Sequence, residues 1–569
     1  MSQSVIAELC NTVAAAPMMA VLDEFAKRVK LSGTPEELAS FSYIQNWLDK
    51  AGFKTNLLSH DAYISLPGKA GLLVGNEQIT CITHSFSQAS PAGGTRGDVV
   101  YLRTGTPADF AGVDVRGKVV MMDGIANPAG SLRASQAGAI GQIHASPHEH
   151  KHEMCISSVW GSPTPETKGR LPQTVVVSIV KADADRLKAR LAAGETVSAT
   201  LQAEVDTRWR QTPILVAELA PPGADADTPF VLFSGHHDTW HLGVMDNGSA
   251  NATMMEVAKI VATRRDEWKR GLRLCFWSGH SHGRYSGSAW YADHFWDDLE
   301  RRCVAHLNID STGGKGASVL TDVLTSSELR GLGGAAVKAH SGQDIVGHRM
   351  ARAGDQSFWG IGLPSIYMGM SEQPSEGAVN LTGSVMGGGG VRKGSGFGWW
   401  WHTPDDTLDK IDPDNLVRDA KIYVETLWHL LGDEVLPLDY ARWAQDFADE
   451  LARVQTAVPG FDMKPLLERT AKLQSHAAAL RTHFDAAAVN QALMRLSRAL
   501  VPIDYTNGDR FDHDPALALP AWPHLDPIRR LATVAGDDAK FAEVAAVRAR
   551  NRVAHGLDQA IAAAKGGAR

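Results

Sequence analysis

The sequence predicts an α/β fold in which a mainly parallel sheet is flanked by helices. Three short apolar runs, at Pro229–Phe233, Leu272–Trp277 and Val304–Ile309, are typical of strands that are buried on both faces. A helical pattern follows the first run at Ala250–Thr263, directly after a capping signal at Asn247–Ser249. Strands and helices that alternate in this way indicate a parallel sheet, whose ligands bind beyond the carboxyl ends of the strands.

Three regions with different patterns divide the chain, and we name them the α/β domain, the insert and the helical domain. The alternating pattern occupies residues 1–60 and 210–435, which form the predicted α/β domain. Residues 61–209 contain short β-like runs separated by turn residues, which predicts a mainly β insert. Residues 436–569 are rich in Ala, Leu and Arg at helical spacing, which predicts a helical domain.

The composition excludes several classes of protein. Hydrophobic residues make up 44% of the 569 residues, enough for well-buried cores. No stretch approaches the roughly 20 apolar residues of a membrane span and the first residues show no basic region, so we expect no membrane association and a cytoplasmic protein. The 56 basic and 64 acidic residues are intermixed, which argues against a nucleic-acid partner. Five scattered cysteines without CxxC spacing indicate neither a disulfide framework nor a zinc ribbon.

Side chains that bind divalent ions occur just beyond the predicted strands or in the loops that lead away from them. The candidate ligands are His236, Asp246, His282, Asp310 and His402. Imidazoles and carboxylates are ligands that zinc accepts, and the two oxygens of Asp246 could bridge two ions. Asp238 lies two residues from His236 and is better placed to orient its neighbour than to bind an ion. The sequence therefore predicts a metal site at the carboxyl edge of the sheet.

Taken in this order, the motifs resemble those of the di-zinc aminopeptidase family, in the branch of the glutamate carboxypeptidases and transferrin receptors. The matching segments are His236-His237-Asp238, Asp246-Asn247, the residues before Gly287-Ser288, Asn308-Ile309-Asp310, and His402-Thr403-Pro404 with Asp406-Thr407. The resemblance implies a zinc aminopeptidase-like fold that holds one or two divalent ions, with zinc expected and manganese as the alternative. It further implies that the insert, notably Val113–Gly124, is similar to a protease-associated domain. The helical domain, including Leu493–Ala499, is similar to a dimerisation domain, so a homodimer is expected.

One motif departs from the family pattern at both of its acids. Counting back from Gly287-Ser288, the ligating Glu of the family falls on His282 and its general-base Glu falls on Ser281. His282 can still bind metal, but a serine hydroxyl is not basic near neutral pH. The usual hydrolytic mechanism therefore lacks its base in this chain.

Three sources of a replacement base remain open. His280 lies two residues from His282, on the same side if the segment is extended, and an imidazole titrates near neutrality. A second source is the histidine-rich stretch 144–153 of the insert, for which a metal-buffering or exposed loop is the alternative reading. A bound ion alone also lowers the pKa of water toward ~7. We favour His280, so the expected catalytic residues are His280, Ser281 and Asp238.

Four residues near these motifs are expected to contact the substrate. By resemblance to a family acid that contacts amines, Asp355 would hold an amino group. Arg284 and Tyr285 would bind a carboxylate or carbonyl, with a structural ion pair as the alternative for Arg284. Trp401 would line an apolar pocket, because three consecutive tryptophans cannot all face one core. A glycine-rich run at 387–390 is expected to form a loop beside the site.

These residues favour a metal-dependent hydrolase of an amide or peptide bond in a small molecule or short peptide. The first alternative is a metal-dependent lyase or intramolecular transferase, because loss of the Glu base suits a reaction that needs no external water. The second is a non-catalytic, transferrin receptor-like binding dimer, against which four intact ligand positions count. Replacement of a ligating Glu by His282 removes negative charge, so we predict weaker occupancy of one ion position.

Overall fold

The computed structural model describes residues 3–346, 349–350, 352–375, 394–482 and 484–566. The glycine-rich run at 387–390 lies outside these residues.

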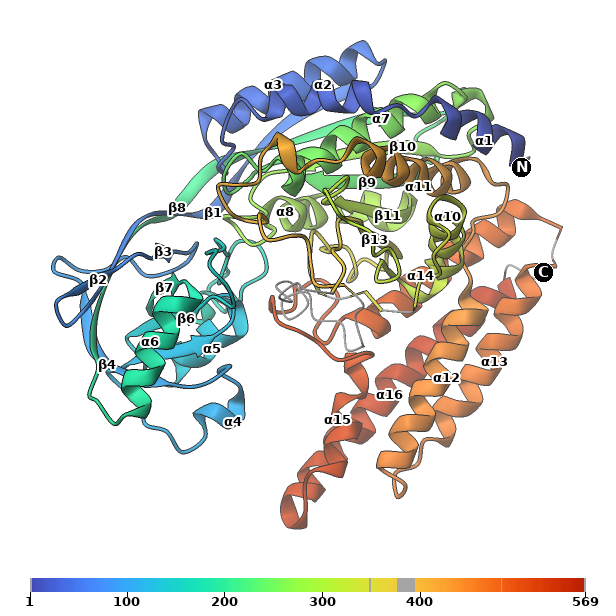
Figure 1. Cartoon of the computed structure of the whole chain (residues 1–569). Coiled ribbons are helices and arrows are strands. Elements are labelled where there is room, and N and C mark those ends of the chain that lie inside the picture. The colour runs from blue at the N-terminus through green and yellow to red at the C-terminus, as the bar shows by residue number, and fades with distance from the viewer. Residues whose placement is uncertain (1–2, 347–348, 351, 376–393, 483, 567–569) are drawn as a thin grey trace.

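A twisted mixed sheet forms the centre of the α/β domain (Figure 1). Its strands follow the order β12-β13-β11-β9-β10-β8, and β9 pairs in parallel with both β10 and β11. The bounds are β8 (Ser198–Leu219), β9 (Phe230–His236), β10 (Gly271–Trp277), β11 (Cys303–Asp310), β12 (Leu324–Thr325) and β13 (Ser365–Gly369). The predicted α/β class is confirmed, and the sheet is mixed because β8 and β12 pair antiparallel with their neighbours.

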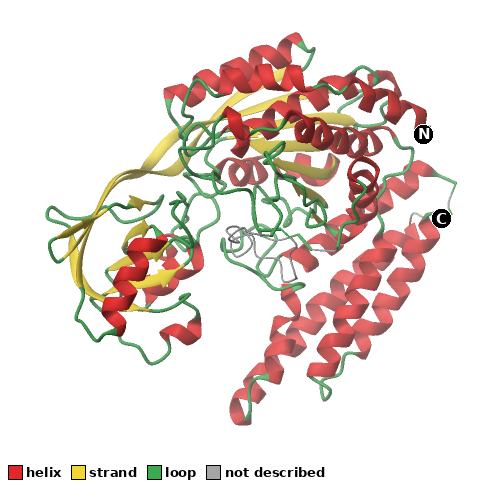
Figure 2. Cartoon of the chain, viewed as in Figure 1, coloured by secondary structure: helices red, strands yellow, loops and turns green. Residues whose placement is uncertain are grey.

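Helices cover both faces of this sheet (Figure 2). They are α1 (Gln3–Thr12), α2 (Ala15–Phe25), α3 (Pro35–Lys50), α7 (Ala250–Ala262), α8 (Ser286–His294), α9 (Trp296–Arg302), α10 (Arg330–Ser341) and α11 (Pro413–Gly432). In the described part of the chain no single helix is both long and apolar enough to cross a membrane. Within the described residues, one pair of helices, Ser4–Thr12 and Ala15–Phe25, is long and apolar enough when the two are taken together, but they are bent by 47° relative to each other.

Alternate residues of the central strands pack on opposite faces of the sheet. Val231 and Phe233 of β9 belong to the core that contains α7 and α11, whereas Leu232 packs in a second cluster with Trp277 and Tyr291. Successive side chains of a strand point to opposite faces, so a strand that is covered on both sides must be apolar throughout. This explains why the predicted runs coincide with β9, β10 and β11.

Two long strands join the α/β domain to the insert. β1 (Lys54–Val74) and β8 pair antiparallel from Lys54 with Glu218 to Val74 with Ala199, with one irregularity between Pro67 and Ala70. The ribbon is visible in Figure 1 as it leaves the central sheet. The predicted domain boundaries at residues 60 and 209 therefore fall inside continuous strands, which belong to both parts of the chain.

The insert combines strands with helices, so it contains more helix than the sequence suggested. Its remaining strands are β2 (Glu77–Ile79), β3 (Ile82–Thr83), β4 (Thr95–Tyr101), β5 (Val119–Asp123), β6 (Gly141–Ala145) and β7 (Val175–Ile179). Its helices are α4 (Pro107–Phe110), α5 (Pro128–Gln136) and α6 (Lys181–Ala192). Because β4, β5, β6 and β7 pair in parallel, crossover connections are required between them, and α5 forms one of these.

The helical domain packs against the α/β domain through buried polar contacts. Its helices are α12 (Tyr440–Ala457), α13 (Lys464–Leu480), α14 (Ala486–Tyr505), α15 (Asp526–Arg529) and α16 (Gly536–Gly566). Arg498 of α14 donates hydrogen bonds to the carbonyl oxygens of Gly362 and Cys303, at 3.0 and 2.6 Å. The predicted C-terminal helical region is thereby confirmed.

Glu328, which is buried near Asp504 where the α/β and helical domains meet, should destabilise the fold as the pH rises. Burial and the charge of Asp504 raise the pKa of Glu328 to about 7. When folding raises the pKa of a carboxyl, the free energy of unfolding of the protein falls as the pH rises from the pKa of the unfolded state to that of the folded state. For Glu328 this range is about pH 4.5 to about pH 7. We expect Glu328→Gln to increase the free energy of unfolding at pH 8 by on the order of 3 kcal/mol, with little change at pH 4.5.

Urea unfolding of both proteins at the two pH values measures this difference. The exposed Glu468→Gln variant serves as the control, and an equal gain at pH 4.5 and pH 8 for Glu328→Gln would contradict the assignment.

Candidate metal centre

Four of the five candidate ligands, all except His282, come together at the carboxyl edge of the sheet. His236 and Asp310 are the last residues of β9 and β11. Asp246 lies in the turn Val244–Ser249 that leads into α7. His280 follows β10, and His402 lies in the loop before α11. Parallel strands end at one edge, so residues far apart in sequence meet there.

One carboxylate lies between two imidazoles at the centre of the site. Oδ1 of Asp246 is 3.1 Å from Nε2 of His236, and Oδ2 is 2.9 Å from Nε2 of His402. Oδ2 of Asp310 lies 3.8 Å from the same nitrogen of His236. Asp246 thus has one oxygen directed to each of two half-sites, which is the arrangement that a bridging ligand requires.

A metal-sized cluster forms on the His236 side of Asp246. One ligand atom each of His236, His280 and Asp310 lies within 4.8 Å of the others, and the described residues contain no second group of this kind. The ring of His280 stacks on that of His236 with centroids 3.6 Å apart. Nδ1 of His280 is 2.9 Å from Oδ2 of Asp355 and donates to it, which leaves Nε2 of His280 with a free lone pair. A carboxylate behind a histidine in this way is typical of metal ligands.

His282, the expected ligand, does not join this cluster. Its Nδ1 lies 2.9 Å from Oγ of Ser32, and its buried Nε2 has no hydrogen-bond partner among the described residues. The reason is the local backbone, because residues 278–284 form bends and turns instead of an extended segment. The carboxylate of Asp238 accepts the N–H groups of His280 and Ser281, at 3.1 and 2.8 Å, and holds this turn. His280 and His282 therefore do not point to the same side.

Two buried aspartates support the centre from behind. The backbone carbonyl of Asp238 lies 2.9 Å from Nδ1 of His236 and fixes the orientation of that ring. The carboxylate of Asp406 accepts the N–H groups of Met245 and Asp246, at 2.8 and 3.0 Å, and burial raises the pKa of Asp406 to about 7. Asp406 belongs to the family motif around His402, and the sequence reasoning did not assign it this role. Ser32 carried no recognisable sequence signal.

The electrostatic field of the site favours a cation. Burial alone opposes a charge on His236, but the neighbouring carboxylates of Asp246, Asp310 and Asp238 raise its pKa to about 10. Burial and the charge of Asp246 raise the pKa of Asp310 above its usual range. A divalent ion satisfies such a set of carboxylates and imidazoles more completely than one proton does, so the residues present fit a metal.

A cavity opens beside the cluster and extends to the insert. It is lined by Met154, Cys155, Trp240, Asp246, His280, Ser281, Arg284, Tyr285, Asp310, Arg352, Ala353, Gly354, Phe397, Trp401 and His402. Three residues with expected substrate contacts, Arg284, Tyr285 and Trp401, line this cavity. Asp355 does not, because it is buried and its carboxylate accepts hydrogen bonds from His280 and Ser288. This geometry does not support the expected contact of Asp355 with a substrate amine.

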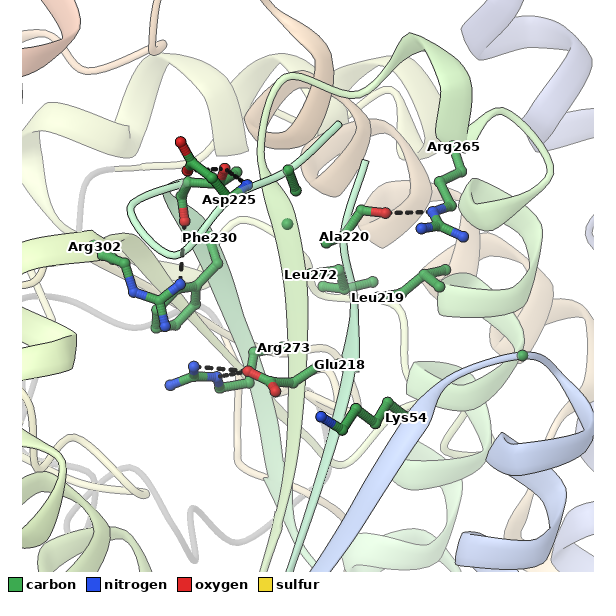
Figure 3. Close-up of a pocket in the computed structure, with 14 residues that line it drawn as sticks. Lys54, Glu218, Leu219, Ala220, Asp225, Phe230, Arg265, Leu272, Arg273 and Arg302 are labelled. Atoms are coloured by element: carbon green, nitrogen blue, oxygen red, sulfur yellow. Dashed lines mark hydrogen bonds and ion pairs between the residues drawn. The ribbon is translucent and has the colours of Figure 1, made fainter. Parts of the chain in front are cut away.

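A second hollow, of about 390 Å³, lies at the opposite, amino ends of β9 and β10 (Figure 3). Its three arginines already have partners. Arg273 pairs with Glu218, Arg302 donates to the carbonyl of Thr228, and Arg265 donates to the carbonyl of Ala220. Its lining contains no histidine, and one of its carboxylates, Glu218, is already paired with Arg273, so this hollow does not offer the donor set found at the carboxyl edge of the sheet.

Comparison with known proteins agrees with this site. Residues 215–427 match the profile described as Peptidase family M28. A probable glutamate carboxypeptidase from Zea mays is 21% identical over 342 residues, which cover 49% of this chain and 48% of that protein. A glutamate carboxypeptidase 2 homolog from Caenorhabditis briggsae is 24% identical over 321 residues, covering 43% of this chain and 41% of the homolog. The chain therefore spans about half, or less, of the length of these relatives.

Solved structures share the fold. A Peptidase M28 precursor from Shewanella amazonensis superposes with a TM-score of 0.58 at 18% identity, covering 76% of this chain and 97% of that one. An aminopeptidase from Aneurinibacillus superposes with a TM-score of 0.55 at 22% identity, covering 75% and 96%. The α/β domain thus has the fold of these aminopeptidase structures. Within it, the segment 215–427 is the part that matches the Peptidase family M28 profile.

Proposed function

We propose that the chain is a metal-dependent hydrolase that cleaves an amide or peptide bond in a small molecule or short peptide. The observation that carries this proposal is the carboxylate of Asp246, shared between His236 and His402 at 3.1 and 2.9 Å. A carboxylate that is shared by two buried histidines is an arrangement suited to metal binding. The match to the Peptidase family M28 profile and the similarity to carboxypeptidases and aminopeptidases support hydrolysis of such bonds.

The donor set supports one tightly bound ion, for which zinc is the expected metal. His236, Asp246, Asp310 and His280 would hold it, with Asp355 behind His280. On the other side of Asp246, His402 is the one histidine or carboxylate at contact distance in the described parts of the chain, so a second ion would bind more weakly. A zinc ion supplies Lewis-acid polarisation of a carbonyl group and activation of water. A solved zinc aminopeptidase from Bacillus subtilis with the same fold, at a TM-score of 0.53 and 17% identity, supports the choice of zinc.

We assign His280 to the ligands, which differs from its expected role as general base. Its Nδ1 is held by Asp355, and its ring is stacked on His236. Ser281 lines the cavity, and its hydroxyl has no partner among the described residues, so it is available to donate to or accept from a substrate.

Two cations beside the cluster support a substrate that carries a carboxylate. Arg284 and Arg352 line the cavity, and neither forms an ion pair within the described residues. Arg352 donates to the carbonyl oxygens of Asp514 and Pro515 and lies over the ring of Trp160 at 4.3 Å, so its charge is oriented but not neutralised. Nε of Arg284 is buried and has no hydrogen-bond partner among the described residues. A guanidinium in this state gains most from an incoming carboxylate.

Arg284→Met should therefore weaken the binding of acid-bearing substrates. A lost charged hydrogen bond of about 1.5–3 kcal/mol corresponds to a roughly 10- to 100-fold rise in KM for a peptide with a free carboxylate. The same peptide with an amidated end should show little change. Steady-state kinetics on the two peptides measures the contrast, with Arg116→Met on the surface of the insert as the control. An equal loss on both peptides would argue against a carboxylate contact.

The proposed function is tested with purified protein whose metal has been removed by a chelator and restored with zinc. We expect about one zinc per chain to be retained on dialysis, and hydrolysis of a panel of aminoacyl and N-acyl amides to depend on it. A protein that retains no ion and hydrolyses no amide after addition of zinc or manganese would refute the proposal.

A further inference from the structure

The insert contacts the loop of His402 through three hydrogen bonds. Nδ1 of His402 lies 2.6 Å from the carbonyl oxygen of Glu153, and the N–H of Glu153 donates to the carbonyl of His402 at 3.1 Å. Nδ1 of His152 lies 2.5 Å from the carbonyl oxygen of Trp401. Two adjacent residues of the insert thus hold two adjacent residues of the α/β domain.

These contacts fix the protonation of both rings. A carbonyl oxygen can only accept, so Nδ1 of His402 and Nδ1 of His152 carry the hydrogens. Nε2 of a neutral His402 is therefore an acceptor, and it is this atom that faces Oδ2 of Asp246 at 2.9 Å. The insert consequently selects the tautomer of His402 that a metal requires.

The histidines of the insert form a hydrogen-bond relay that ends at this loop. The N–H of His150 donates to Nδ1 of His148 at 3.0 Å, so a neutral His148 carries its hydrogen on Nε2. That atom lies 3.3 Å from Nε2 of His152, which is free to accept. Burial lowers the pKa of His148 to about 4 and that of His152 to about 3, so both rings are neutral at physiological pH. The relay uses the lone pairs of His148 Nδ1 and His152 Nε2 that a metal would need.

The loop of His402 needs such support. His402 has a φ of 58°, in the left-handed region that a residue with a side chain adopts at a cost of roughly 1–2 kcal/mol. Trp401 stacks on His402 with ring centroids 3.5 Å apart, so the position of Trp401 bears directly on that of the His402 ring. The histidine-rich stretch of the insert is itself held in place, because the N–H of Lys181 donates to the carbonyl oxygen of His148 at 3.0 Å.

We propose that the insert is an integral part of the metal centre, in which His152 is a positioning residue that holds Trp401 and His402 so that Nε2 of His402 faces Asp246. This inference rests on the proposed metal-dependent function. It assigns the histidine-rich stretch a structural role in the centre, in place of the proton-accepting role considered from the sequence.

A matched pair of variants tests this role. In His152→Asn the side-chain amide can donate from the place of Nδ1, whereas in His152→Gln the amide reaches the place of Nε2 and the contact with Trp401 is lost. Both replacements are polar and uncharged, so general effects on folding are similar. His144→Gln is the control, because His144 is buried in the insert and its ring contacts Gln142.

Cobalt(II) titration of the metal-free full-length proteins, followed by visible absorption, reports both affinity and ligand geometry. We expect His152→Gln to bind the second, weaker cobalt ion, on the His402 side of Asp246, roughly 10- to 100-fold more weakly than the wild type and with an altered spectrum, as for other partners of metal-bound histidines. His152→Asn and His144→Gln should retain the wild-type spectrum. If the Asn and Gln variants behave alike, whether both intact or both impaired, the inference is wrong. A wild-type protein that binds no cobalt would instead overturn the proposed function itself.

Discussion

Asp246→Asn is expected to abolish metal binding and amide hydrolysis together. Among the described residues, the carboxylate of Asp246 is the one group within contact distance of both His236 and His402, and an amide offers only one weakly basic oxygen in its place. Loss of the shared ligand removes the Lewis acid that supplies several kcal/mol of transition-state stabilisation. We therefore expect kcat/KM to fall by a factor on the order of 10³ or more.

The measurement is metal per chain by plasma mass spectrometry, made on the same samples as the amide assay. Asp504→Asn is the matched control, because Asp504 of the helical domain is also buried but pairs with Arg349. The control should keep its metal. A variant Asp246→Asn that retains a full equivalent of zinc after dialysis would show that the centre lies elsewhere.

His280→Asn is expected to lower metal affinity by more than the roughly 10- to 100-fold that outer partners of metal ligands contribute. The Asn amide can still reach Asp355 from the position of Nδ1, but nothing then replaces Nε2 in the cluster with His236 and Asp310. Asp355→Asn, which leaves the imidazole in place, should show the smaller effect of about 10- to 100-fold.

The opposite result would restore the role that the sequence suggests for His280. A general base contributes about 10²- to 10⁴-fold to the rate and nothing to metal binding. Zinc competition with a fluorescent chelator gives the affinity, and saturating-zinc kinetics gives kcat. If His280→Asn keeps the wild-type zinc affinity while kcat falls within that range, then His280 is the base and not a ligand.

The sequence by itself determined the sheet and the edge at which the site lies. Strands β9, β10 and β11 begin and end within three residues of the predicted apolar runs, because strands that are covered on both faces must be apolar throughout. His236, Asp246, Asp310 and His402 could be identified for a similar reason. Each follows a strand or precedes a helix, and the carboxyl ends of parallel strands meet at one edge.

Only the tertiary structure decided which histidine of the 280–282 turn faces the metal ligands. An extended segment would place His280 and His282 on one side, but two N–H groups bound by Asp238 bend the chain and direct His280 toward His236. The supporting role of the insert was equally hidden, because the contact of His152 with Trp401 joins residues 249 positions apart. Periodicity and motif spacing describe local structure, whereas the direction of a side chain in a turn and the contacts between distant loops depend on how the folded parts pack.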